Sequence, residues 1–202
     1  MTTTSDRLPT VIPANYVSGP EQGRWTYKEY AAIPDDGKRY EIVNGVLFMT
    51  LPPGIPHQRA TGCFFHYLST HIEDAGLGWV FVSPVDVQLA PNVVVQPDVA
   101  IVLKAGLEKI TESRIIGTPD LVIEVASPST ATYDRREKYD AYARAGVPEY
   151  WIADTAAQTI EVFVLEARIY RSLGVFRGGA TLPSKVVPEL PVRVEQFFAP
   201  IL

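Results

Sequence analysis

Residues 119–130 read PDLVIEVASPST, and the run from Leu121 to Ala126 is apolar except for one acid, Glu124. The run LVIEVA is predicted to form a strand. An ionised carboxylate is almost never fully buried unless it is paired, hydrogen-bonded or bound to a metal. The role of this strand therefore depends on what Glu124 contacts.

A second acid interrupts another apolar, strand-like segment. Asp98 lies within residues 95–102, VQPDVAIV. Because side chains alternate across a strand, Asp98 shares a face with Ala100, and Glu124 shares a face with Ala126. The two acids are 26 residues apart (124 − 98), which is enough for two strands and a connection. If those strands are neighbours, the acids can meet on one face, and their small neighbours leave room there.

Two explanations fit such a pair of acids. Carboxylates held close in a poorly solvated site repel each other, so one is protonated or both share a cation. Their hard oxygen atoms suit Mg²⁺ or Mn²⁺. In the alternative, Arg114 or Lys138 forms a structural ion pair with a lone buried acid. The residues alone leave both explanations open.

The order of the other elements predicts an α/β (α+β) fold, with a mixed central sheet flanked by helices. Residues 1–24 lack clear periodicity and are predicted to form a flexible N-terminal arm, and residues 25–202 a single domain. The first predicted elements are a short helix that begins at Thr26, with Glu29 as its capping partner, and ends at Pro34, a hairpin that turns at Asn44-Gly45, and a helix from about His57 to Asp74. Strand-like segments follow at 78–90, 93–103 and 121–126, with a surface connection at 104–118. The last elements are a helix with Asp134 and Glu137 as its N-cap pair and Gly146 at its end, strands at 149–154 and 159–165, and one or two further strands with a short terminal helix.

The composition is that of an ordinary globular protein, with 47% hydrophobic and 20% charged residues. No apolar run approaches the ~20 residues that span a bilayer, and the N-terminus lacks the pattern of a secretory signal. The single cysteine, Cys63, excludes an internal disulfide framework. These features predict a cytoplasmic protein with no membrane partner. The net charge of −5, without a basic stripe, argues against tight nonspecific DNA binding by a monomer.

Six segments in order resemble the Uma2 family, also catalogued as DUF820. They are YEIVNG, the loop with His57, PDVAIV, PDLVIEVASPST, DRREKYDAY and GVPEYWIAD. The resemblance extends from about Thr26 to the C-terminus. That family is placed in the PD-(D/E)XK nuclease-like superfamily, so the resemblance implies a restriction-endonuclease-like core with an N-terminal hairpin extension.

The resemblance also implies which residues hold a divalent ion, Mg²⁺ or Mn²⁺. The acids of the superfamily motif correspond to Asp98 and Glu124. The lysine that usually stands two residues after the glutamate is replaced here by Ala126. The resemblance suggests that Lys138, in the next helix and 14 residues after Glu124 (138 − 124), supplies the missing cation. This requires that the helix packs on the sheet face that bears Glu124.

Further polar residues have two interpretations each. Glu41 is the expected third metal ligand, or else an exposed hairpin carboxylate. His57 would orient water or phosphate, or else is a polar loop residue. Tyr142 lies one helical turn beyond Lys138 and either bonds a site carboxylate or belongs to the core. Asp120 also follows a proline, but it lies ~13 Å from Glu124 along an extended chain and is left out of the site.

The expected function is that of a divalent-metal-dependent endonuclease that hydrolyses nucleic-acid phosphodiester bonds, with DNA as the expected partner. The alternative is a non-catalytic nucleic-acid-binding or protein-interaction module that keeps the nuclease fold. A third reading is hydrolysis of a smaller phosphoester. A site plugged by side chains, or an arginine paired with Glu124, would favour the module. The apolar C-terminal strands could support a homodimer.

Overall fold

The computed structural model describes residues 11–126 and 131–198, whose strands form two six-stranded sheets. The strands of the central sheet are β4 (Gly78–Val82), β7 (Val99–Leu103), β9 (Leu121–Ala126), β10 (Glu149–Asp154), β11 (Thr159–Glu166) and β12 (Ile169–Arg177). In space they follow the order β12-β11-β10-β9-β7-β4. Strands β9 and β10 are parallel, and every other neighbouring pair is antiparallel.

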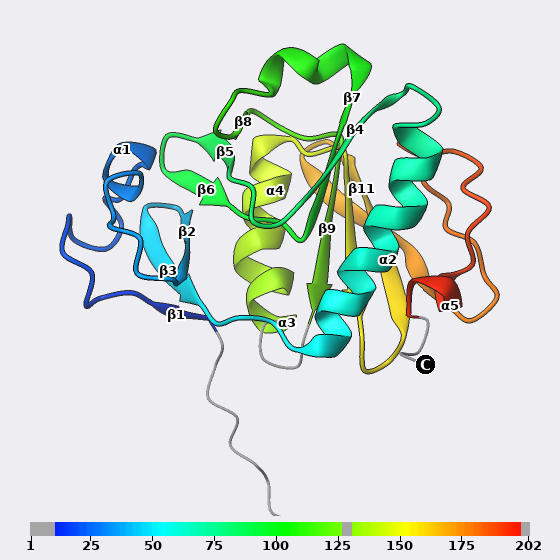
Figure 1. The fold of residues 1–202 in the computed structure, drawn as a ribbon, viewed down its shortest axis with the longest axis horizontal. Helices are drawn as coiled ribbons and strands as arrows, with labels where there is room; N and C mark the ends of the chain where they lie inside the picture. Colours follow the sequence, from blue (N-terminus) through cyan, green and yellow to red (C-terminus); the bar gives the residue numbers. More distant parts are fainter. Residues whose placement is uncertain (1–10, 127–130, 199–202) are drawn as a thin grey trace, which may run out of the picture.

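Helices cover both faces of this central sheet (Figure 1). A parallel pair of strands needs a crossover connection. Between β9 and β10 this connection contains α3 (Ala131–Tyr133), the π-helical turn η2 (Asp134–Lys138) and α4 (Tyr139–Ala145). Helices α2 (Ile55–Ile72) and α5 (Val194–Phe197) lie on the opposite face. The prediction of a mixed sheet flanked by helices is confirmed. Among the described residues, no helix is long and apolar enough to cross a membrane.

The second sheet contains the predicted N-terminal hairpin. Its strands, in the spatial order β1-β3-β2-β6-β5-β8, are β1 (Val11–Pro13), β3 (Val46–Thr50), β2 (Arg39–Val43), β6 (Val93–Val95), β5 (Val87–Ala90) and β8 (Ile115–Ile116). The hairpin β2–β3 turns at Asn44 and Gly45, whose φ angles are 54° and 75°. Both residues are in the left-handed region, as a type I′ Asn-Gly turn requires. The short helices α1 (Tyr27–Tyr30) and η1 (Lys104–Lys109, a 3₁₀ helix) complete the fold.

The two faces of β9 are buried against different neighbours. Ile123 and Val125 belong to the apolar cluster beneath α2. Val122 and Ala126 belong to a second cluster, which contains residues of α4 and of the hairpin sheet. Because side chains alternate along a strand, Glu124 lies on this second face. The sequence-based assignment of the faces is therefore confirmed.

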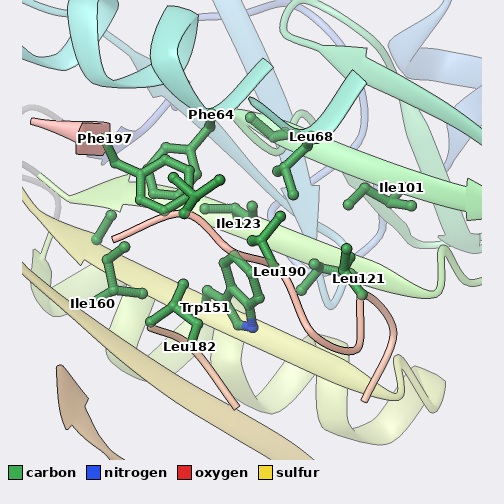
Figure 2. Close-up of a cluster of buried hydrophobic side chains, with 14 of the residues drawn as sticks. Phe64, Leu68, Ile101, Leu121, Ile123, Trp151, Ile160, Leu182, Leu190 and Phe197 are labelled. Carbon is green, nitrogen blue, oxygen red and sulfur yellow. The ribbon is translucent and has the colours of Figure 1, made fainter. Parts of the chain in front are cut away.

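The core beneath α2 is built around aromatic side chains (Figure 2). Phe64 is fully buried, stacks on Phe197 at 4.3 Å between ring centroids and lies 6.5 Å from the Trp151 ring. Stacked and tilted rings at such separations are favourable arrangements. Phe64 thus joins α2 to both α5 and β10, and this packing fixes the helix that carries His57.

We expect Phe64→Ala to lower the free energy of unfolding by about 3–5 kcal/mol, because it removes a buried ring and leaves a cavity. Its neighbour Phe65, which is 38% exposed, provides the matched control. Phe65→Ala should change stability by less than about 1 kcal/mol. Chemical denaturation of both variants measures the difference, and equal losses would show that Phe64 is not a core anchor.

Part of the predicted N-terminal arm is ordered by pairing. Of residues 1–24, residues 1–10 lie outside the described part of the chain. Val11–Pro13 forms β1 and pairs antiparallel with β3, and the Ala14 amide donates to the Leu47 carbonyl at 2.8 Å. The arm assignment is therefore wrong for the residues that add this edge strand. An edge strand carries little sequence signal of its own, because its partner strand supplies its hydrogen bonds.

Two strand-like segments of the sequence are divided in the structure. Residues 78–90 contain β4 and β5, and residues 93–103 contain β6 and β7. Pro84 lies in the first break and Pro97 in the second. Proline lacks the N–H that a strand ladder needs, which accounts for a break beside it. The second break leads directly into Asp98.

The crossover helix begins earlier than the sequence predicts. Asp134 is expected as its N-cap, but helix is already present at Ala131, and residues 127–130 lie outside the described ranges. Asp134 instead starts the π-helical turn that ends at Lys138. Such turns occur as local bulges in α-helices, often at functional sites. This turn carries Lys138, a buried cation, toward the central sheet.

Candidate active site

The pairing of β7 with β9 brings the two motif acids together. Val99 is opposite Ile123 in antiparallel register, so Asp98 and Glu124 occupy the next positions of the two strands. Asp98 Oδ2 accepts a hydrogen bond of 2.8 Å from the Val125 amide. The condition that these strands are neighbours is therefore met, and both acids are almost completely buried.

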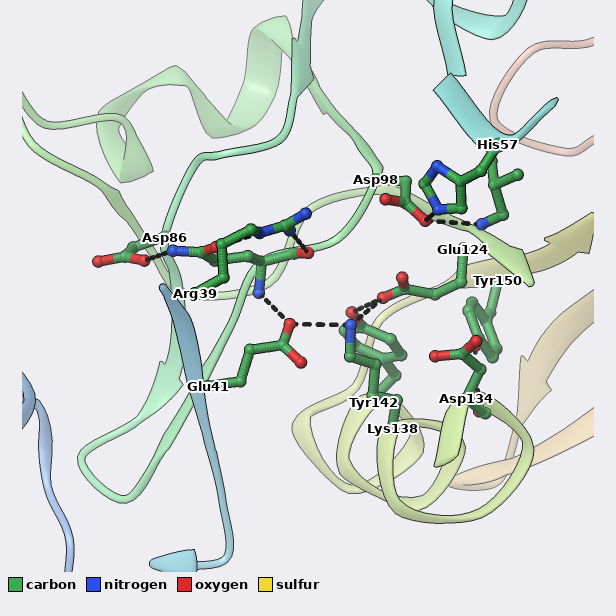
Figure 3. Close-up of polar contacts among 12 residues, drawn as sticks. Arg39, Glu41, His57, Asp86, Asp98, Glu124, Asp134, Lys138, Tyr142 and Tyr150 are labelled. Atoms are coloured by element: carbon green, nitrogen blue, oxygen red, sulfur yellow. Dashed lines mark hydrogen bonds and ion pairs between the residues drawn. The ribbon is translucent and has the colours of Figure 1, made fainter. Parts of the chain in front are cut away.

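Lys138 bridges two carboxylates in this site (Figure 3). Its Nζ lies 2.9 Å from Glu124 Oε1 and 2.8 Å from Glu41 Oε1. The crossover helix therefore packs on the sheet face that bears Glu124, as the sequence-based hypothesis requires. Tyr142 donates to Glu124 Oε1 at 2.6 Å and is itself fully buried, so it is both a hydrogen-bond donor and a core residue.

Glu41 is part of this buried cluster rather than an exposed hairpin residue. Only 2% of its surface is exposed, and its Oε1 accepts a hydrogen bond of 2.6 Å from the backbone N–H of Gln96. Its Oε2 is buried without a hydrogen-bond partner among the described residues. The alternation of Arg39 and Glu41 along β2 directs both side chains to the same face. The hairpin thus contributes a carboxylate to the site from the second sheet.

His57 lies at the N-terminal end of α2 and contacts the other motif acid. Its Nε2 is 3.0 Å from Asp98 Oδ2, and its backbone carbonyl accepts a hydrogen bond from Thr61 Oγ1. Pro56 precedes it within the first turn of the helix, where proline is well tolerated. The first turn of α2 therefore places an imidazole against Asp98.

The charges of the cluster affect one another strongly. Burial raises the pKa of Glu124 well above its usual range, and nearby Asp98, Asp134 and Glu41 add to this, while Lys138 opposes it. Burial alone would lower the pKa of Lys138, but Glu124 and Glu41 outweigh burial and raise this pKa above its usual value. Lys138 is therefore held as an ammonium ion within a cluster that carries an excess of acidic groups.

The acids open onto a shared cavity of about 150 Å³. It is not filled by side chains, and none of the ion pairs of the described residues joins an arginine to Glu124. The polar side chains that line it are Arg39, Glu41, Thr50, His57, Gln96, Asp98, Glu124, Tyr133, Asp134 and Lys138. The features that would favour a plugged binding module are thus not found in the described site.

The donor chemistry fits a hard divalent cation. Asp98 and Glu124 offer carboxylate oxygens to one cavity, and Mg²⁺ is commonly bound through one or two carboxylates, with water and phosphate completing its shell. No group of three His, Cys, Asp or Glu side chains within residues 11–126 and 131–198 is arranged to hold a metal ion. The role of Glu41 as a third metal ligand stays a prediction, because its Oε1 already contacts Lys138.

Five polar residues that line the cavity were not identified from the sequence as site residues: Arg39, Thr50, Gln96, Tyr133 and Asp134. Arg39 could have been found from its shared strand face with Glu41, and Gln96 from its position two residues before Asp98. Asp134 is predicted as a helix N-cap, a position that is usually exposed, so its burial is not expected from the sequence. Asp120 does not line the cavity and accepts a hydrogen bond from the Leu103 amide, which agrees with its exclusion.

We expect Lys138→Met to lower the free energy of unfolding by about 3–5 kcal/mol, because it leaves two buried carboxylates without their cation. Adding Glu124→Gln should restore part of this loss. The exposed pair of Arg171 and Glu166, whose side chains are 55% and 48% accessible, provides the control. Arg171→Met should cost less than about 1 kcal/mol in the same denaturation experiment. A similarly small loss for Lys138→Met would contradict a charged, buried Lys138.

Comparison with known proteins shows which proteins the chain is similar to. The model of the Uma2 family, described as "putative restriction endonuclease", matches residues 27–195. A similar fold is found in the crystal structure of a "putative nuclease belonging to DUF820" from Anabaena variabilis ATCC 29413. The two chains are 17% identical with a TM-score of 0.73, and the match covers 87% of this chain and 98% of the other. No curated protein matches the chain.

Proposed function

The chain belongs to the Uma2 family, and we propose that it is a divalent-metal-dependent endonuclease that hydrolyses phosphodiester bonds in nucleic acid, with DNA as the expected substrate. One observation carries this proposal. Lys138 reaches the cavity of Asp98 and Glu124 from the crossover helix, and so supplies a cation that Ala126 lacks at the usual motif position. A cavity with two motif acids and a lysine is the minimum that this chemistry needs.

Asp98 and Glu124 would hold Mg²⁺ or Mn²⁺ in this proposal. When bound, such an ion polarises a phosphoryl oxygen and lowers the pKa of a bound water. Hydrogen bonds from the Val125 amide and from Tyr142 orient the two carboxylates. Holding the donor atoms in advance reduces the reorganisation that binding and reaction would otherwise require.

Lys138 and Glu41 have linked roles in the proposal. The ammonium of Lys138 would donate toward the negative charge that develops on the reacting phosphate, as a preorganised cation in a poorly solvated site does most effectively. Glu41 contacts the same Nζ from the hairpin and would hold it in place. Glu41 therefore acts mainly as a positioning residue, and its second oxygen is available as the predicted third metal ligand.

His57 would act at the other side of the cavity. Its contact with Asp98 Oδ2 places an imidazole at the edge of the site, 12% exposed at the side chain. From there His57 can orient water or phosphate and can fix the rotamer of Asp98. Because His57 would act partly by holding the Asp98 carboxylate, it is a positioning residue as well as a candidate substrate contact.

A non-catalytic module that keeps the fold is the second candidate, and one observation favours it. Lys138 already neutralises part of the charge of Glu124, as in the structural ion pair that the sequence left open. A protein of net charge −5 also gains little from long-range attraction to nucleic acid. Metal binding separates the two candidates, because the module has no need of an ion.

We expect calorimetric titration with Mn²⁺ to show saturable binding by the wild type and none by a folded Asp98→Asn/Glu124→Gln double variant, because the ion needs both anionic ligands. Asp120→Asn is the matched control, since Asp120 also follows a proline but binds the Leu103 amide outside the cavity. It should retain wild-type Mn²⁺ binding. Cleavage of DNA with Mg²⁺ or Mn²⁺ should be lost in the same double variant.

The opposite result has a clear meaning. A wild type that takes up no Mn²⁺ at millimolar concentration would contradict a metal-dependent nuclease and favour the binding module. Binding that survives in the double variant would place the ion elsewhere. DNA rather than RNA as substrate, a cytoplasmic location and a homodimer through the C-terminal strands stay predictions.

A further inference from the structure

Arg39 lies at the edge of the acid cavity with a fixed orientation. Its Nε donates to Gln96 Oε1 at 3.0 Å, and its Nη2 lies 3.4 Å from the Gln96 carbonyl oxygen. Gln96 is held in turn, since its Nε2 donates to Tyr30 at 3.1 Å and to Asp86 at 2.9 Å. These hydrogen bonds hold the guanidinium from one side, and Figure 3 shows Arg39 and Asp86 at the two ends of the part that leads to Asp86.

The guanidinium of Arg39 retains unused donor capacity. Arginine has five N–H donors, and the contacts with Gln96 engage only some of them. Throughout the described ranges, no carboxylate lies within ion-pair distance of Arg39. A half-buried arginine without a carboxylate partner is suited to bind an anion from outside the protein, and phosphate matches its planar donors well.

Arg39 also joins the acid cavity to a second hollow of about 390 Å³. Both are lined by Arg39 and by residues 50–53, so they are contiguous. The second hollow has an apolar wall of Met49, Leu51, Pro52, Pro53 and Pro84, and neither aspartate nor glutamate lines it. It therefore differs sharply in charge from the acid cavity. An apolar wall beside a cation is suited to a nucleoside with its phosphate.

Three residues that line the acid cavity have buried polar atoms without a partner in the described part of the chain, and one of these residues, Thr50, also lines the second hollow. Thr50 is directly opposite Arg39 in the β2–β3 pairing, and its buried Oγ1 has no hydrogen-bond partner among the described residues. The same holds for Glu41 Oε2 and Tyr133 Oη, which line the acid cavity. An unpaired buried polar atom is costly, so a polar ligand or ordered water that bonds to these atoms would be favourable.

We propose that the second hollow is a substrate subsite for the nucleotide next to the scissile bond, and that Arg39 contacts the phosphate adjacent to the one that reacts. This rests on the proposed nuclease function. Substrate backbone that approaches Glu41, Asp98 and Glu124 meets repulsion from their carboxylates. Arg39 offsets this repulsion at the point where the nucleic-acid strand leaves the acid cavity, and so sets the register of the substrate.

Binding of a fluorescein-labelled DNA oligonucleotide, followed by anisotropy with Ca²⁺ as the divalent ion, tests the subsite. We expect Arg39→Gln to weaken binding about tenfold or more and to reduce the salt slope of log K by about 1. The affinity of Arg39→Lys should lie between those of the wild type and Arg39→Gln, because lysine keeps the charge but lacks the planar donors. Arg171→Gln, at an arginine already paired with Glu166, should bind as the wild type does.

A second readout compares two substrates. Arg39→Gln should lower kcat/KM for the oligonucleotide through KM, and should lower kcat/KM for bis(p-nitrophenyl) phosphate by a much smaller factor, because this diester has no flanking phosphate for Arg39 to contact. Thermal midpoints of both Arg39 variants close to that of the wild type establish that they are folded. Should Arg39→Gln be unfolded, Arg39→Lys alone carries the comparison.

The outcomes separate the two proposals. A folded Arg39 variant with unchanged affinity and salt slope, or a wild type that binds no oligonucleotide, overturns the subsite. Cleavage by the wild type that Arg39→Gln does not alter would remove the subsite and keep the nuclease. Oligonucleotide binding that depends on Arg39, in a protein that cleaves neither substrate with Mg²⁺ or Mn²⁺, would keep Arg39 as a nucleic-acid phosphate contact and remove the nuclease.

Discussion

The ammonium of Lys138, held between the carboxylates of Glu41 and Glu124, is the contact on which the candidate site depends. Its three participants come from the hairpin strand β2, the central strand β9 and the crossover helix. A buried charge is tolerated only when it is paired and hydrogen-bonded. These three charges are paired only when the two sheets and the crossover helix are packed together in this arrangement.

The same contact gives the site a particular electrostatic character. Four acids line the cavity with Lys138, and burial keeps water from screening them. Such a site attracts cations and repels anions. A phosphodiester can enter only if positive charge offsets the acids, and Arg39 stands beside the cavity without a carboxylate partner among the described residues. The acid cavity and the second hollow, which no described aspartate or glutamate lines, are therefore complementary in charge.

The site is supported by a conventional apolar core. Beneath α2, Phe64, Trp151 and Phe197 pack as aromatic neighbours and hold the helix that carries His57. On the other face of β9, the apolar contacts of α4 surround the polar cluster. Rigid elements on both faces of the sheet hold the acids in place, which is favourable for preorganised binding and catalysis.

Local sequence determined most of the central strands, the Asn44-Gly45 turn and the face of β9 on which Glu124 lies, because turn chemistry and side-chain alternation act over a few residues. It also identified the acids and Lys138, through their resemblance to a family motif. Only the tertiary structure decided that Glu41 is buried against Lys138, that the crossover helix starts before Asp134, and that Arg39 borders the cavity. These depend on contacts between residues far apart in the chain, which no local pattern records.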